Sequence, residues 1–334
     1  MIEMVITGTL IGAGFASGKE IYLFFYRYGF YGFIGIIICS ILLGILLYKI
    51  LSLSLKYKIS NYSDFLSLFI KNKLLKKSSI IITNVFLLLT FFVMIAGFGA
   101  YLNQEFGVNY TIGIGIISVL CFFIFLKGAK GVEKVSSILV PVLIFFIFFL
   151  GIKNIKLITN IFCIENEIIH CNLYNNWFIQ ALLYCSYNLY LLIPVLINFT
   201  GKLNKKKVIR ISINCMFIIF ALLLSIFVVL SKETVYNLSF IEMPVIYLIE
   251  DNEPVLKVIY GIIISFSIIT TAISEGIGFI KGIKIKEKNY WKIVLIMCIL
   301  GILVSYLGFT SLVQILYPVI GLIGIIQIIY ILKI

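Results

Sequence analysis

A glycine-rich run near the N-terminus is the first candidate for chemistry. Gly8, Gly12, Gly14 and Gly18 fall within eleven residues of one apolar segment, residues 4–27. Glycine destabilises a helix interior by about 1 kcal/mol relative to alanine. A helix that breaks within a membrane frees carbonyl and amide groups, which can bind ions and anionic groups. Close helix packing is the alternative, because glycines four residues apart let two backbones touch.

Polar side chains directly after these glycines favour the break. Ser17, Lys19 and Glu20 follow in the same segment. An adjacent lysine and glutamate within a membrane span are energetically costly unless they pair or face a cavity. We therefore expect a discontinuous first helix, with Lys19 and Glu20 as gating or proton-relay residues.

A second polar centre lies in the apolar segment over residues 175–199. Ser186, Tyr187 and Asn188 stand near its middle, and Pro194 follows. Polar groups together with a proline weaken the hydrogen-bond ladder of a helix inside a membrane. This pattern predicts a second broken helix. A kinked helix whose polar side chains are satisfied is the alternative.

The composition indicates which kind of protein positions these residues. Hydrophobic residues make up 62% of the 334 residues, charged residues 12%, and the mean hydropathy is +1.16. Soluble domains carry about 25% charged residues. The chain cannot cover itself with polar surface, so its outside must face lipid. The net charge of +13 then reflects basic loops at one membrane face and does not indicate nucleic-acid binding.

Ten apolar segments are long enough to cross a bilayer, which takes about 20 residues. They cover residues 4–27, 30–52, 79–103, 109–127, 132–151, 175–199, 208–231, 255–280, 290–308 and 311–332. A further apolar stretch, Met243–Ile249, is too short to span. We expect it to form a helix lying on the outer mouth of the protein.

The distribution of basic residues orients the spans. Of the 27 Lys and Arg residues, 21 lie in one set of loops and helix ends and five in the other. This bias places both termini in the cytoplasm. Two groups of five spans then form one transmembrane domain over residues 1–334. An odd number of spans per group inverts the second group relative to the first, over about residues 1–151 and 174–334.

Several motifs resemble the YkvI-like bacterial membrane proteins. The most specific is Gly12-Ala-Gly-Phe-Ala-Ser-Gly-Lys-Glu-Ile21; the others are Ala181–Leu189 with Pro194, Glu242-Met243-Pro244 and Thr270-Thr271. That family is similar to the amino acid–polyamine–organocation superfamily of transporters. The resemblance implies an all-α, LeuT-like membrane fold of ten helices in a five-plus-five inverted repeat, with helices 1 and 6 broken. It also implies alternating access around a site between these helices.

The resemblance also implies the site residues. The substrate-binding residues would be Gly12, Ala13, Gly14, Phe15, Ser17, Gly97, Tyr184, Ser186, Tyr187 and Asn188. Related transporters bind Na⁺ between the helix 1 break and hydroxyls of helix 8, the role that Thr270, Thr271 and Ser274 match. Hydrogen bonding of these hydroxyls to their own helix is the alternative. Glu275, a carboxylate within helix 8, either carries a proton or pairs with a lysine such as Lys281.

These residues predict a secondary active transporter of a small organic solute. An amino acid or related zwitterion, coupled to Na⁺ or H⁺, fits the helix 1 amides. The alternative is a non-transporting membrane sensor or assembly partner that retains the fold. No catalytic residue is predicted, because the single histidine, His170, lies in a loop and no metalloprotease or hydrolase motif is present. We expect no cofactor and no metal beyond Na⁺. A disulfide or metal contact of Cys163 and Cys171, which flank His170, stays open.

Overall fold

The chain is a bundle of α-helices. The structure is a computed structural model that describes residues 2–10, 12–59, 61–127, 132–157, 176–197, 203–250, 252–283 and 289–333. The long helices are α4 (Gly29–Lys56), α6 (Lys73–Phe106), α7 (Tyr110–Lys127), α8 (Val132–Lys153), α9 (Trp177–Ile197), α10 (Lys205–Leu230), α13 (Pro254–Gly282), α14 (Tyr290–Ser305) and α15 (Phe309–Lys333). Shorter helices are α5 (Tyr62–Ser67), α11 (Val235–Ser239) and α12 (Pro244–Tyr247). Cys163, His170 and Cys171 lie outside the described residues.

Six helical segments of the described residues are long and apolar enough to cross a membrane. They are Lys19–Lys56, Lys73–Phe106, Tyr110–Lys127, Lys205–Leu230, Pro254–Gly282 and Phe309–Lys333. Val140–Lys153 and Tyr290–Ser305 are shorter apolar helices. Large apolar side chains such as Phe145 and Phe217 are exposed on the outside of the bundle. In water this surface would be unfavourable, whereas lipid solvates it.

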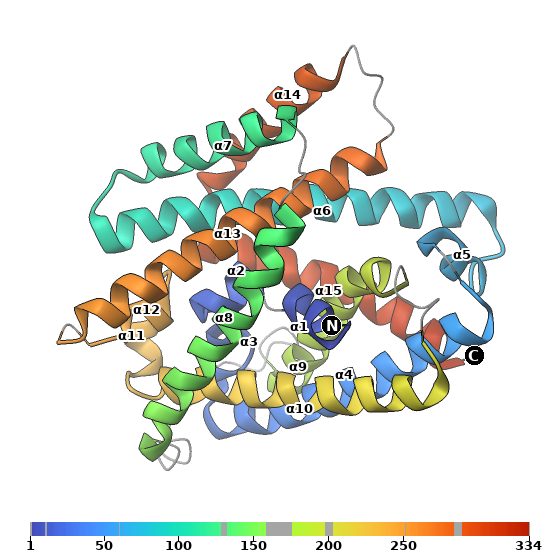
Figure 1. The fold of residues 1–334 in the computed structure, drawn as a ribbon, viewed down its shortest axis with the longest axis horizontal. Helices are drawn as coiled ribbons and strands as arrows, with labels where there is room; N and C mark the ends of the chain where they lie inside the picture. The colour runs from blue at the N-terminus through green and yellow to red at the C-terminus, as the bar shows by residue number, and fades with distance from the viewer. Residues whose placement is uncertain are drawn as a thin grey trace.

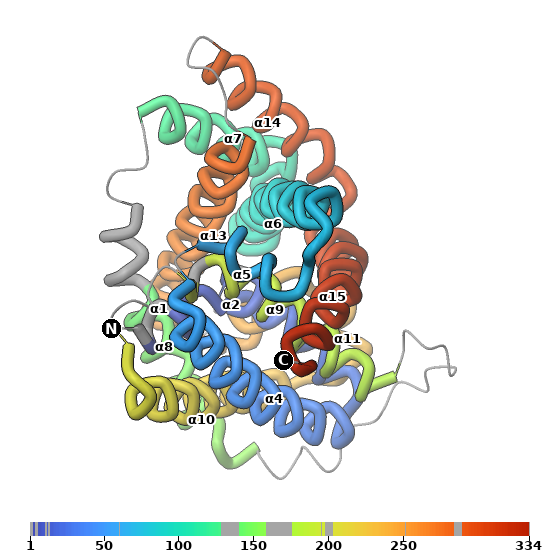
Figure 2. Tube along the Cα trace, turned by 90° about the vertical axis from the view of Figure 1, so that its right-hand side faces the viewer, coloured from blue at the N-terminus to red at the C-terminus, as the bar shows by residue number. Residues whose placement is uncertain are grey.

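In Figure 1, α6 and α10 run horizontally and α8 crosses the view at a steep angle, with the short N-terminal helices among the long ones. In Figures 1 and 2, α7 and α14 lie at one edge of the bundle and α4 and α10 at the opposite edge. Between the edges, α9 packs against α15 and α6 packs against α13. In Figure 1, α11 and α12 lie at the left end of the long helices, whereas α5 and the C-terminus lie at the right end.

The first predicted span is interrupted, as the glycines indicated. It consists of α1 (Ile2–Leu10), α2 (Ala13–Ser17), α3 (Lys19–Phe24) and the 3-10 turn η1 (Tyr26–Tyr28). Gly12 is extended at φ −81° and ψ −178°, which separates α1 from α2. Gly18 adopts the left-handed conformation at φ 82°, where a side chain is strained. The segment therefore has two interruptions, one at each end of α2.

The sixth predicted span is not broken within the described residues, so that prediction is wrong. α9 is one α-helix from Trp177 to Ile197. Its polar centre is satisfied without unwinding. The Ser186 hydroxyl lies 2.7 Å from the carbonyl oxygen of Gly321 on α15 and 3.0 Å from that of Leu183. Pro194 lies in the last turn of α9, where its missing N–H weakens only the end of the helix.

The apolar stretch between α10 and α13 contains a short helix, as expected. α12 begins with Pro244, which is favourable at a helix N-terminus because its missing N–H has no intrahelical partner there. Val245 and Ile246 are buried, and α12 packs against α2, α10 and α13. The stretch thereby packs on the middle of the interrupted first span, at α2 and Gly18.

Candidate functional site

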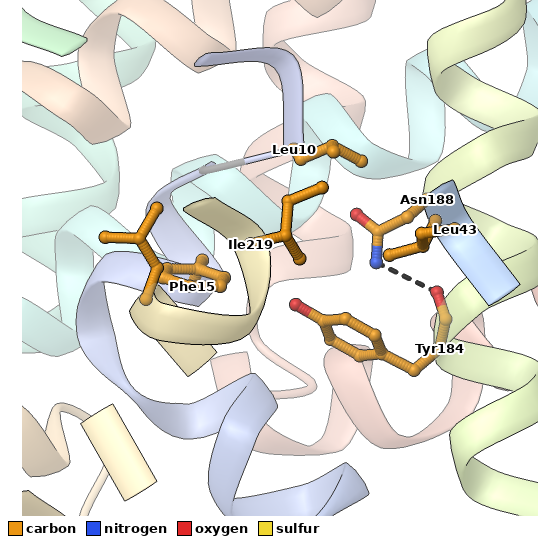
Figure 3. A pocket seen from close by; sticks show the side chains of 7 residues that line it. Leu10, Phe15, Leu43, Tyr184, Asn188 and Ile219 are labelled. Atoms are coloured by element: carbon orange, nitrogen blue, oxygen red, sulfur yellow. Dashed lines mark hydrogen bonds between the residues drawn. The ribbon is translucent and has the colours of Figure 1, made fainter. Parts of the chain in front are cut away.

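A small cavity lies beside the interruption between α1 and α2. Its volume is about 10 Å³, which is room for about one water molecule, and its walls come from α1, α2, α4, α9 and α10. The lining residues are Leu10, Phe15, Leu43, Tyr184, Asn188, Ile219 and Leu222. We call it the helix-break cavity (Figure 3). Three of its residues, Phe15, Tyr184 and Asn188, were predicted for the substrate site.

Two polar side chains of α9 give this mainly apolar cavity its hydrogen-bonding groups. Asn188 Nδ2 donates to the carbonyl oxygen of Tyr184, one turn earlier, at 2.9 Å. Figure 3 shows the Tyr184 hydroxyl and the Asn188 amide pointing towards the space between Leu10, Phe15 and Ile219. A mainly apolar lining with a few placed polar groups is typical of small-molecule sites, but at this volume the cavity is closed to anything larger than water.

The other predicted residues of the first span form the backbone next to this cavity. Gly12 precedes α2, and Ala13 and Gly14 begin it. The Ser17 hydroxyl donates to the carbonyl oxygen of Gly14 at 2.8 Å and accepts the N–H of Lys19 at 3.2 Å. Ser17 therefore holds the turn between α2 and α3, where the chain changes direction.

Glu20 and Tyr187 meet on the α3 side of the break. Tyr187 donates its hydroxyl hydrogen to Glu20 Oε2 at 2.5 Å. The carboxylate lies against Gly14, where an added Cβ would be 2.0 Å from Glu20 Oε1. The Tyr187 ring packs against Tyr184, with centroids 5.3 Å apart, so the carboxylate is connected to the helix-break cavity through these two rings.

Two predicted substrate residues are engaged elsewhere. Ser186 joins α9 to α15 through the Gly321 carbonyl, as described above. Gly97 of α6 faces Phe309, whose ring atoms would lie 3.2 Å from an added Cβ. Neither residue lines the helix-break cavity.

The residues predicted to bind Na⁺ follow one another along α13. Thr270 Oγ1 donates to the carbonyl oxygen of Phe266 at 2.9 Å, and Ser274 Oγ donates to that of Thr270 at 2.8 Å. Thr271 is partly buried between them. Glu275, the next residue, has a buried Oε2 atom that finds no hydrogen-bond partner among the described residues.

Tyr260 of α13 contacts the interrupted first span at α2, and the sequence did not predict this contact. Its hydroxyl donates to the carbonyl oxygen of Ala16 at 2.8 Å, and its side chain is fully buried. This bond satisfies a backbone oxygen of α2 that a five-residue helix cannot satisfy itself. A tyrosine in the first part of an apolar span was the only signal, and many membrane helices carry one.

The end of the bundle near α11 is closed by a row of side chains on α3 and η1, which we call the α11 closure. Lys19 is fully buried and points its ammonium at the carbonyl oxygens of Leu238, Ser239 and Ile241, at 3.4, 3.0 and 2.6 Å. Two phenols continue the row. Tyr22 donates to the carbonyl oxygen of Val235 at 3.1 Å, and Tyr26 to that of Glu233 at 2.7 Å. All acceptors lie between residues 233 and 241.

The opposite end, near α5, is closed by hydroxyl groups, which we call the α5 closure. The hydroxyls of Thr83 on α6 and Tyr190 on α9 lie 2.7 Å apart. Tyr62 of α5 lies 3.4 Å from Thr83, and Gln327 of α15 donates to the Tyr62 hydroxyl at 3.5 Å. Four helices are thereby connected at this end.

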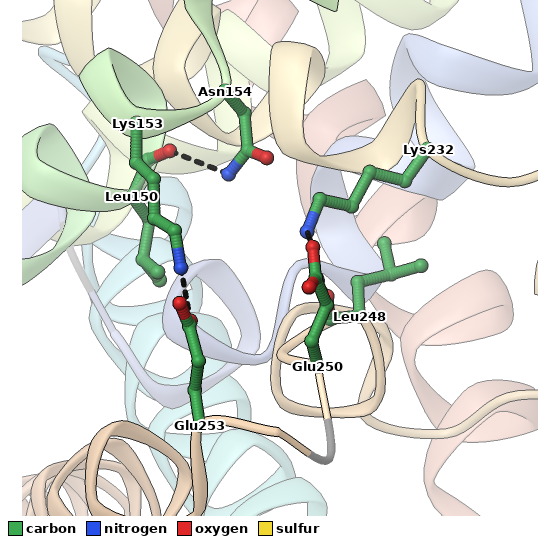
Figure 4. A network of polar contacts seen from close by, with 7 residues as sticks. All are labelled: Leu150, Lys153, Asn154, Lys232, Leu248, Glu250 and Glu253. Atoms are coloured by element: carbon green, nitrogen blue, oxygen red, sulfur yellow. Dashed lines mark hydrogen bonds and ion pairs between the residues drawn. The ribbon is translucent and has the colours of Figure 1, made fainter.

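Ion pairs surround a surface hollow close to the α11 closure. Lys153 at the end of α8 pairs with Glu253, and Lys232 lies 3.3 Å from Glu250 (Figure 4). Lys232 holds the pKa of the exposed Glu250 carboxyl below its ordinary value. The backbone N–H of Thr234 and the Asn237 side chain lower the pKa of Glu233 in the same loop.

Comparisons with known proteins agree with this architecture. No family model matches the chain. It is 25% identical over 341 residues to the uncharacterized membrane protein YkvI of Bacillus subtilis (strain 168), covering 96% of this chain and 91% of YkvI. It is 25% identical over 320 residues to the uncharacterized protein YyaD of the same organism, with the same coverages. The crystal structure of MhsT in complex with L-phenylalanine superposes with a TM-score of 0.64 at 17% identity, over 98% of this chain and 87% of MhsT.

The two sequence relatives confirm the resemblance that the motifs indicated, and the MhsT match establishes the fold. The membrane description of YkvI agrees with the apolar helices of this chain. The chain is similar along most of its length to YkvI and YyaD of Bacillus subtilis and has the LeuT-like fold of MhsT.

Proposed function

We propose that the chain is a secondary active transporter of a small organic solute, an amino acid or related zwitterion, coupled to Na⁺ or H⁺. The solute binds at the helix-break cavity, which widens to admit it when one end of the bundle opens. The observation that carries this proposal is the interruption at Gly12, directly beside a cavity with Phe15, Tyr184 and Asn188 in its walls. Interrupted helices mark substrate and ion sites in membrane transporters, because their free backbone groups line a cavity.

The cavity walls favour a solute with an apolar part. Leu43, Ile219 and Leu222 supply apolar surface, whereas Tyr184 and Asn188 supply the groups that orient a polar end. MhsT, which shares the fold, was crystallised with L-phenylalanine, an amino acid of this kind. An apolar amino acid is therefore the first solute to test.

The transporter has ten spans in one domain, with inverted repeats over about residues 1–151 and 174–334, in a bacterial cell membrane. The distribution of Lys and Arg supports cytoplasmic termini. On this orientation the α11 closure faces outward and the α5 closure faces the cytoplasm. Alternating access opens one closure while the other stays formed.

Thr270, Thr271 and Ser274 are the residues proposed for the Na⁺ form of coupling. The Thr270 and Ser274 hydroxyls donate to carbonyls of their own helix. A hydroxyl oxygen that donates its hydrogen keeps lone pairs, which suit a hard cation. Na⁺ coupling predicts uptake that requires a Na⁺ gradient.

Uptake by purified protein in liposomes tests the proposal. Labelled apolar amino acids are supplied under an imposed Na⁺ or H⁺ gradient, and we expect accumulation under one of them. Ile219→Trp fills the cavity and is expected to reduce uptake at least tenfold. The matched control is Ile213→Trp, an exposed position on the same helix, which is expected to retain uptake. Tyr184→Phe, which removes one hydroxyl, weakens solute affinity without changing the fold.

A sensor that retains the transporter fold gives a different result. It binds the solute, as seen by a rise in Tm, but accumulates none under any gradient. Equal uptake by Ile219→Trp and Ile213→Trp would show that the solute does not pass through the helix-break cavity.

A further inference from the structure

Glu20 is a carboxylate enclosed by protein on every side. It is 4% exposed. Tyr187 donates to one of its oxygens, and the other lies against the backbone of Gly14. Aromatic rings complete the enclosure: Phe24 packs on Tyr184 and Tyr187 with centroids 5.4 and 5.7 Å apart, and Tyr317 of α15 packs on Tyr187 at 4.9 Å.

The charged groups around Glu20 do not neutralise it. The ion pairs among the described residues are Lys153–Glu253, Lys232–Glu250 and Lys257–Glu105. Lys19 is adjacent in sequence but directs its ammonium to the carbonyls of the α11 closure. From α13, the carboxyl group of Glu275 is the nearby acidic group. The groups facing Glu20 from α9 and α15 are the phenols of Tyr184, Tyr187 and Tyr317.

A carboxylate without a cationic partner is unfavourable inside a membrane protein, and a bound proton or another cation relieves it. The packing decides which cation fits. On the side of Gly14 the packing is tight, because an added Cβ there would lie 2.0 Å from Glu20 Oε1, and Tyr187 occupies Oε2. A metal ion or an ammonium group needs several ångströms, whereas a proton needs no added volume. Because a phenol can donate or accept, Tyr187 stays hydrogen-bonded to Glu20 whether or not the carboxyl carries a proton.

We propose that Glu20 binds the proton whose movement drives transport, and that Tyr187 and Tyr184 link it to the solute in the helix-break cavity. This inference rests on the proposed function and selects H⁺ as the coupled ion. Water on the side of the open closure supplies the proton, which converts the carboxylate to the neutral acid. After the closures exchange, the acid releases the proton to water on the other side.

Proteoliposomes containing a pH-sensitive dye test this assignment. The wild-type protein is expected to move protons when a solute gradient is applied, and to accumulate solute when a pH gradient is applied. Glu20→Gln keeps a hydrogen-bond acceptor for Tyr187 but cannot ionise. We expect it to retain solute exchange between equal pools within about threefold of wild type, and to lose solute-driven proton movement and pH-driven accumulation at least tenfold.

Two further variants separate proton binding from a structural role. Tyr187→Phe removes the hydrogen bond but leaves the carboxyl, and is expected to keep proton movement with an altered pH profile. Glu3→Gln, a carboxylate at the start of α1 that accepts a bond from Asn214, is the matched control and keeps coupling. If Glu20→Gln is not monodisperse, Glu20→Asp retains an acid and is expected to keep proton movement at a shifted pH.

The outcomes distinguish this inference from the proposed function. Wild-type uptake that needs Na⁺ and moves no protons overturns the inference and leaves the transporter proposal standing. Solute-driven proton movement in Glu20→Gln equal to wild type also overturns it. Absence of wild-type transport under every gradient, with solute still bound, overturns both proposals.

Discussion

The α11 closure and the α5 closure differ in the chemistry of their hydrogen bonds. In the α11 closure a buried ammonium and two phenols donate to backbone carbonyls, and the Lys19–Ile241 distance is 2.6 Å. In the α5 closure every group is neutral, and two of the three contacts measure 3.4 and 3.5 Å. Bonds with a charged partner contribute about 1.5–3 kcal/mol, against about 0.5–1.5 kcal/mol for neutral ones. The α5 end is therefore the easier one to open.

Lys19→Met is expected to have the largest effect, because it removes the charged donor of the stronger closure. The carbonyls of Leu238, Ser239 and Ile241 lose that donor in a buried place. We expect a loss of roughly 2–4 kcal/mol in the free energy of unfolding, seen as a fall in Tm. Lys206→Met, at an exposed position, is the control. Equal Tm values for the two variants would show that Lys19 does not make the α11 closure the stronger one.

Gly18→Ala tests the packing of the α11 closure separately from its charge. Gly18 has φ 82°, and an added Cβ would lie 2.6 Å from Val245 Cγ2. Gly107 is also left-handed, at φ 64°, but an added Cβ meets nothing within 4 Å. Both variants carry the conformational cost of about 1 kcal/mol, and only Gly18→Ala also displaces α12. We expect a Tm at least 3 °C lower for Gly18→Ala than for Gly107→Ala. Equal Tm values would show that α12 can move away from the added Cβ without loss of stability.

Tyr190→Phe measures how much a hydrogen bond of the α5 closure contributes to stability. The change removes the hydroxyl 2.7 Å from Thr83 and is expected to lower the free energy of unfolding by about 1 kcal/mol. Thr83→Val should have a similar effect, and the double variant should add little, because both remove the same bond. Strict additivity of the two effects on Tm would mean that Thr83 and Tyr190 act independently. A loss as large as that of Lys19→Met would contradict the ranking of the closures.

Glu250→Gln is expected to have the smallest effect, since it removes an exposed ion pair beside the α11 closure. Lys232 lowers the pKa of the folded Glu250 carboxyl below its ordinary value of 4.5. The pair therefore stabilises the fold above that pH and loses this contribution as the pH falls through the folded-state pKa. We expect Tm values of wild type and Glu250→Gln to agree within about 2 °C at pH 7 and to converge at pH 3. A larger Tm difference at pH 3 than at pH 7 would contradict the expected pH dependence of this ion pair.

The sequence predicted the helices and the first interruption because both depend on local features. Apolar length defined the spans, and the glycines around Gly12 weakened the first. The continuity of α9 could not be predicted, because the Ser186 hydroxyl is satisfied by Gly321, 135 residues away. Leu43 and Ile219 line the helix-break cavity, but in the sequence nothing distinguishes them from the other apolar residues of the membrane spans. Their role depends on how α4 packs against α9 and α10, and on how α10 packs against α1.

The central claim is that solute reaches the helix-break cavity from two sides in turn. Asn188→Cys, in a protein whose seven native cysteines are replaced, places one thiol in the cavity wall. A membrane-impermeant thiol reagent is then applied from either side of oriented vesicles. The account predicts labelling from the cytoplasmic, α5 side in this variant, and from the opposite side once Lys19→Met is added. Labelling from the same side in both proteins, or from neither, would contradict it.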